Sequence, residues 1–118
     1  MKLSSLATYF VTGGLFTALI VALEESGHRT LSGLVTLVPV FTLVAYFFIG
    51  ESAGGAAVGQ HARWVLAGTL VSWVPYMLVV AYLAPKVGPQ KAILAGLAVF
   101  VVLALLYIAA ANRLKLFQ

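Results

Sequence analysis

The chain has 118 residues, of which 63% are hydrophobic and 8% charged, and its mean hydropathy is +1.09. Soluble domains carry about 25% charged residues, so this composition excludes a soluble globule and indicates an all-α integral membrane protein. The absence of cysteine excludes disulfides and thiolate metal sites, and the formal charge of +4, spread over loops and ends, indicates membrane anchoring rather than nucleic-acid binding.

Four apolar runs predict an integral membrane four-helix bundle that forms a single transmembrane domain over residues 1–118. Each run has roughly 18 to 20 residues, enough to cross the ~30 Å hydrocarbon core as a helix. The first run is longer than the apolar core of a secretory signal, so we expect it to be retained. The helices are expected at about residues 6–23, 31–49, 64–83 and 92–111.

The first predicted helix carries small residues at intervals of four, at Gly14, Ala18 and Ala22. Small residues at this spacing allow the backbone of another helix to approach closely. We expect internal packing here, and a dimer interface is the alternative. Glu24 and Glu25 follow as solvated carboxylates, or alternatively as groups in a vestibule.

The second and third predicted helices contain nearly the same sequence, at residues 34–46 and 70–82. Leu, Val, Val, Pro, Val, Ala and Tyr recur at aligned positions, and Thr36 becomes Ser72. Since consecutive crossings run in opposite directions, this pattern predicts an inverted repeat, which is typical of transporters. The glycine-rich residues 50–63 between the copies predict a flexible connector, with a lid or partner site as the alternative.

Each copy of the repeat has a proline near the middle of its span. Proline inside a helix removes one hydrogen bond and displaces the carbonyl four residues earlier. We therefore expect kinks at Pro39 and Pro75, with the Val35 and Val71 carbonyls freed near the bilayer midplane. An unpaired carbonyl in hydrocarbon costs several kcal/mol, so a hydroxyl, a neighbouring helix, water or a solute must satisfy it.

Helical spacing places a hydroxyl, the proline and a tyrosine on one face in each copy. Two further aromatic residues beside the second copy can stack or donate hydrogen bonds. In the alternative interpretation, the hydroxyls bond to their own helices, the prolines give shape and the tyrosines lie at the membrane interface. The candidate residues for contact with an unknown small solute are Thr36, Pro39, Tyr46, Ser72, Trp73, Pro75, Tyr76 and Tyr82.

No charged side chain lies well inside a predicted span, which disfavours a proton relay or an ion-coupled site. His28 and His61 lack metal-ligand spacing, and no nucleophile has a base near it in sequence. We therefore expect no metal, no cofactor and no enzymatic activity.

The positive-inside rule favours cytoplasmic termini only weakly, because four basic residues fall on the side of the termini and three on the other. This near balance also permits insertion in both directions, and hence an antiparallel homodimer. The side of the termini holds Lys2, Arg63, Arg113 and Lys115, and the other side holds Arg29, Lys86 and Lys91.

A family resemblance is carried by residues of the second and third predicted helices, namely Gly33, Leu34, Pro39, Phe41, Leu43, Ala45, Ser72, Pro75 and Tyr76. Over roughly residues 18–83 the chain resembles the GlpM-like family of small membrane proteins. The resemblance implies a multi-pass protein of the bacterial inner membrane with four helices. The family is named for its link to glycerol-3-phosphate metabolism, has no assigned mechanism and supplies no binding residues.

These observations predict a small transporter or permeation protein that works as a homo-oligomer, with a dimer favoured. Four helices fill their own interior with side chains, so a solute path needs at least two protomers. The alternative is a non-transporting accessory or scaffold protein that regulates another membrane protein through the small-residue face of its first helix and residues 50–63.

Overall fold

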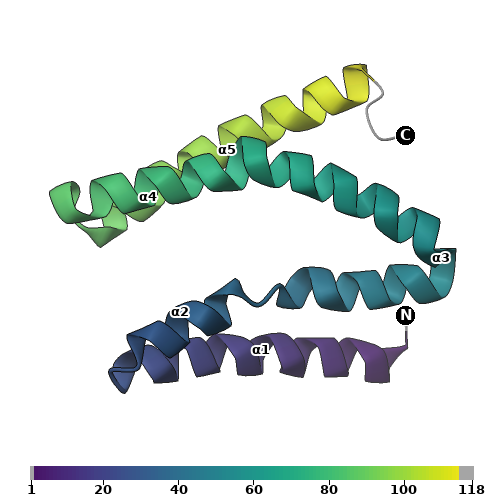
Figure 1. Cartoon of the computed structure of the whole chain (residues 1–118), viewed down its shortest axis with the longest axis horizontal. Helices are drawn as coiled ribbons and strands as arrows, with labels where there is room; N and C mark the ends of the chain where they lie inside the picture. Colours follow the sequence, from purple (N-terminus) through teal and green to yellow (C-terminus); the bar gives the residue numbers. More distant parts are fainter. Residues whose placement is uncertain (1, 115–118) are drawn as a thin grey trace. The chain divides into compact units, whose positions relative to one another are not determined.

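A computed structural model describes residues 2–114, and all of their regular structure is helical (Figure 1). The predicted all-α fold is therefore confirmed. In chain order the elements are α1 (Leu3–Glu25), α2 (Arg29–Leu37), α3 (Val40–Gly68), the π-helical turn η1 (Thr69–Trp73), α4 (Val74–Val87) and α5 (Pro89–Arg113).

The structure shows three long apolar helical stretches where the sequence predicts four separate ones. Within residues 2–114, three helical stretches are long and apolar enough to cross a membrane: Leu3–Glu25, Arg29–Val87 and Pro89–Arg113. The difference arises at residues 50–63, which are helical within α3 instead of forming an irregular connector. Alanine and other good helix formers between the glycines favour this helix. Inside α3, Gly54 has the non-helical backbone angles φ 86° and ψ 177°.

The chain divides into two compact units, Met1–Gly54 and Gly55–Gln118. In the first unit, α1 packs on α2 after a short turn (Figure 1). Gly27 at the turn has φ 82°, a conformation that glycine adopts without a steric penalty, and the His28 N–H donates to the Leu23 carbonyl at 2.8 Å. Ser32 is only 5% exposed, and its hydroxyl donates to the Ile20 carbonyl of α1 at 3.0 Å.

In the second unit, η1 and α4 pack on α5. Gly96 of α5 allows the close approach, because a Cβ there would lie 2.8 Å from Val80 Cγ2 and 3.2 Å from the Tyr76 carbonyl oxygen. Ala92 and Ala111 are buried in the same helix. Small residues therefore set the contact between α4 and α5, as expected for helices that approach closely in a membrane.

Tyr107 joins α5 to α3. Its hydroxyl donates to the Trp64 carbonyl at 2.6 Å, and its ring centroid lies 5.1 Å from that of Trp64. Gly68 makes room for the tyrosine, since a Cβ there would lie 2.9 Å from Tyr107 Cε1.

We expect Tyr107→Phe to lower the free energy of unfolding by about 1 kcal/mol, because it removes this hydrogen bond and keeps the ring contact. The measurement is reversible unfolding of the purified protein in mixed detergent micelles. Tyr82→Phe, at a side chain that is 64% exposed, is the matched control. Equal stability of the two variants would show that the hydrogen bond to Trp64 contributes nothing.

Candidate functional site

The first predicted proline breaks the helix instead of kinking it. α2 ends at Leu37 and α3 begins at Val40, and Val38 between them is extended, with φ −64° and ψ 124°. The cause is Pro39, which has no N–H to donate and disfavours helical angles in the residue before it.

The break frees a different carbonyl from the one predicted. The Val35 carbonyl accepts a hydrogen bond from the Val38 N–H at 3.1 Å, so the expectation that it is unpaired is wrong. The Thr36 carbonyl loses its helical donor instead, because the Val40 N–H bonds to the Val38 carbonyl at 2.9 Å. The end of α2 therefore presents a main-chain acceptor within an apolar stretch.

The first unit contains three of the candidate residues, Thr36, Pro39 and Tyr46, and the last two lie together beside the break. Pro39 and Tyr46 line one open hollow of about 420 Å³ on the surface of α3. The Thr42 hydroxyl, on the same hollow, donates to the Pro39 carbonyl at 3.0 Å. The Thr36 hydroxyl donates to the Ser32 carbonyl at 2.8 Å. Its oxygen keeps lone pairs that can accept a hydrogen bond from a solute.

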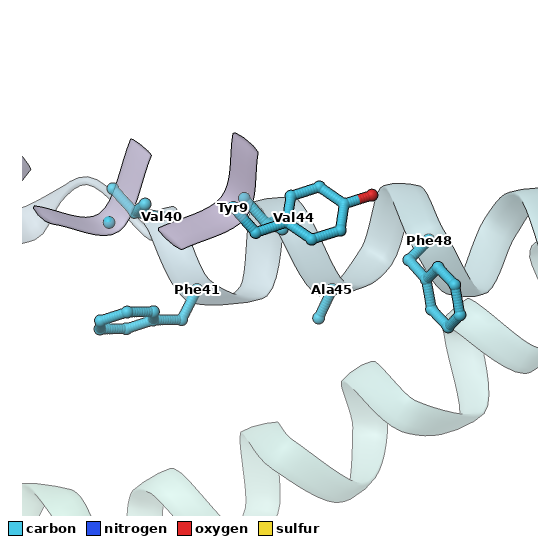
Figure 2. A pocket seen from close by; sticks show the side chains of 7 residues that line it. Tyr9, Val40, Phe41, Val44, Ala45 and Phe48 are labelled. Atoms are coloured by element: carbon cyan, nitrogen blue, oxygen red, sulfur yellow. The ribbon is translucent and has the colours of Figure 1, made fainter. Parts of the chain in front are cut away.

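A second cavity, which the sequence did not indicate, lies between α1 and the first turns of α3 (Figure 2). Its volume is about 330 Å³, and only Tyr9 among its lining residues has a polar atom in its side chain. An apolar lining of this kind suits a hydrocarbon group rather than a polar solute. The lining residues are Tyr9, Gly13, Val40, Phe41, Val44, Ala45 and Phe48.

The second predicted proline lies in an unbroken helix. Pro75 follows the π-helical turn η1, in which the Val74 N–H donates to the carbonyl of Thr69, five residues earlier. A π-turn widens the helix and accommodates a proline ring that would clash with an α-helical carbonyl. The structure thus has a π-turn where the sequence predicts a kink, and Val71 lies within that turn.

Each of the other candidate residues in the second unit contacts different groups. Ser72 is 6% exposed, and its hydroxyl donates to the Gly68 carbonyl at 2.6 Å. Tyr76 packs edge-on against Phe100 of α5, with ring centroids 6.4 Å apart. Trp73 is exposed.

Tyr82 is exposed and lies under a lysine. The Lys86 ammonium nitrogen is 3.6 Å from the centroid of its ring. A tyrosine with a cation over its face near the end of an apolar helix fits the interfacial role that was the alternative in the sequence analysis.

The two copies of the sequence repeat therefore differ in their backbone. One is interrupted at Val38 and Pro39, and the other continues through η1 into α4. The inverted relation between them stays a prediction.

Comparison with known protein families gives a match. A family model described as "GlpM protein" matches residues 8–115, a wider range than the residues that carried the resemblance. No curated protein and no solved structure matches the chain.

Proposed function

This chain belongs to the GlpM family, and we propose that it is a multi-pass transporter or permeation protein of the bacterial inner membrane that acts as a homo-oligomer. Family membership and three long apolar helical stretches support a small membrane protein. The transport role, the oligomer and the inner-membrane location are our proposals.

The length of the middle stretch supports more than one crossing within it. A straight helix of the 59 residues Arg29–Val87 would be about 90 Å long, three times the thickness of the hydrocarbon core. The non-helical backbone at Gly54 offers a place for the chain to change direction. We therefore propose that the segments before and after Gly54 cross the membrane separately.

The helix break at Val38 and Pro39 is the observation that carries the transport proposal. Main chain without helical hydrogen bonds at membrane depth is tolerated only where protein covers it or where it lines a water-filled cavity. Transporters build their solute sites from such discontinuous helices. Here the break combines a Thr36 carbonyl that lacks its helical donor with an adjoining hollow lined by Pro39 and Tyr46.

The groups at the break favour an uncharged, hydroxylated solute. No charged residue occurs in the sequence between Arg29 and Glu51, so the site offers carbonyl and hydroxyl oxygens without a counter-ion. Such oxygens accept hydrogen bonds from the hydroxyl groups of small polyols. Glycerol is therefore the first solute to test.

We expect proteoliposomes that contain the native protein to take up glycerol faster than empty liposomes. The double variant Thr36→Val with Thr42→Val should reduce that uptake at least fivefold, because each substitution removes a hydroxyl beside the break that is proposed to contact the solute. Stopped-flow light scattering after an osmotic step measures the rate. Thr8→Val with Thr12→Val is the matched control, because these α1 hydroxyls also bond to their own helix, at 2.9 and 2.8 Å, but are distant in sequence from the break.

Two outcomes would contradict this proposal. If the native protein gave no more uptake than empty liposomes for glycerol and a panel of other small polyols, permeation of this solute class would be excluded. If a different protein co-purified with it in a fixed ratio, that result would favour the accessory role.

A further inference from the structure

A long open groove runs along α1 and is bordered at one point by Phe41 of α3. It has a volume of about 800 Å³ and extends from Tyr9 to Glu25, a rise of about 24 Å along the helix. Its floor contains glycine, and a Cβ added at Gly14 would meet no atom within 4 Å. The groove is thus nearly as long as the membrane core is thick, and it fits the backbone of another helix.

The two ends of α1 carry opposite charges. Lys2 directly precedes the helix, and Glu25 ends it and lines the groove. The ion pair at this end joins Arg29 to Glu24 at 3.4 Å. Within residues 2–114, Glu25 forms no salt bridge. A helix that fills the groove stabilises this carboxylate if it brings a cation to the same end.

We propose that the groove holds α1 of a second copy of the chain, inserted in the opposite direction. This inference rests on the homo-oligomer of the proposed function and specifies its interface. An antiparallel pair places Lys2 of each copy beside Glu25 of the other, and both contacts form at once because a two-fold axis relates them. A parallel pair would instead bring like charges together at both ends.

The alignment that places Lys2 beside Glu25 also places the glycines of the two α1 helices where the helices cross. When Lys2 lies opposite Glu25, Gly13 lies opposite Gly14, so neither helix has a side chain of its own at the crossing, and the Phe41 ring, 3.9 Å from a Cβ built at Gly13, borders it. Close contact of this kind is the usual driving force for helix association in lipid. The near balance of Lys and Arg between the two sides of the predicted topology is compatible with the required insertion in both directions.

The chain has no cysteine, so introduced cysteines report contacts without background. In the proposed pair, Leu6 lies opposite Val21, and the two Val21 residues are about 22 Å apart along the helix axis. We therefore expect a disulfide when Leu6→Cys and Val21→Cys chains with different tags are co-expressed, and none when either is expressed alone, because a disulfide needs Cα atoms within about 7 Å. Thr8→Cys with Leu19→Cys, in the same register on another face, is the matched control and should not cross-link.

The charges and the direction of insertion are tested separately. Lys2→Glu should reduce cross-linking at least threefold in the Leu6 and Val21 assay, and adding Glu25→Lys to both chains should restore it. A Lys2→Cys variant in inverted and right-side-out vesicles should react with a membrane-impermeant maleimide in comparable amounts.

Several results would overturn the inference. A disulfide in Val21→Cys chains expressed alone would show a parallel pair, and labelling of Lys2→Cys from one side only would exclude opposite insertion. If Leu6→Cys and Val21→Cys chains did not cross-link, together or alone, while the native protein sedimented as a dimer, the proposed interface would be wrong. The homo-oligomer of the proposed function would still stand. A monomer in native membranes would refute both, whereas glycerol uptake, measured without cysteines, tests transport independently.

Discussion

Gly96→Ala is expected to lower the free energy of unfolding by about 1 to 3 kcal/mol, the usual effect of overpacking a close contact. The added Cβ would lie 2.8 Å from Val80 Cγ2, 3.0 Å from Tyr76 Cδ2 and 3.2 Å from the Tyr76 carbonyl oxygen. The two side chains can rotate, but the carbonyl is part of α4, so the helices must move apart. Reversible unfolding in mixed micelles, followed by tryptophan fluorescence, measures the change.

Gly33→Ala is the matched control for this prediction. Gly33 also lies inside a helix, and a Cβ there would meet nothing within 4 Å. Alanine has the higher helix propensity, so this variant should be as stable as the native protein or more stable by up to about 1 kcal/mol. If both variants behaved alike, the contact between α4 and α5 at Gly96 would be looser than the structure shows.

Pro39→Ala is expected to lower glycerol uptake at least tenfold. Without proline, Val38 is free to adopt helical angles, and the Val40 N–H can then donate to the Thr36 carbonyl. The variant would thus join α2 to α3 and remove the main-chain acceptor on which the proposed site depends. Amide hydrogen exchange at Val40 measures the structural change, and stopped-flow uptake measures the functional one.

Pro85→Ala serves as the control for Pro39→Ala, because Pro85 lies inside α4, where the helix is already continuous. Its uptake should stay within twofold of the native rate. If Pro39→Ala slowed amide hydrogen exchange at Val40 but left glycerol uptake unchanged, the helix break would have no part in the mechanism.

The first and last helices are the parts of the fold that the sequence predicts best. The first and last helices were expected at residues 6–23 and 92–111, and they extend over Leu3–Glu25 and Pro89–Arg113. The additional residues are mostly polar or charged, so hydropathy alone ends these helices too early. The glycine content of residues 50–63 predicts a loop, but these residues lie within α3 because neighbouring alanines favour a helix.

The two prolines show what local sequence cannot predict. Both occur in almost the same sequence, yet Pro39 follows an extended residue and Pro75 follows a π-turn. The surroundings differ: Tyr76, next to Pro75, packs against Gly96 and Phe100 of α5, whereas Pro39 is exposed. Contacts with residues distant in sequence thus decide whether the backbone before the proline is extended or forms a π-turn. The cavity beside Tyr9 was missed for a related reason, since it needs both α1 and α3.

The tight turn at Gly27 has a consequence for how the protein is made. Only residues 26–28 separate α1 from α2, so this pair closes at little entropic cost and can assemble while later residues are still on the ribosome. The basic residues within this pair are Lys2 and Arg29, one at each end of α1. In the proposed opposite insertion, the pair α1–α2 would contribute no charge bias, and residues translated afterwards would decide the orientation of each copy.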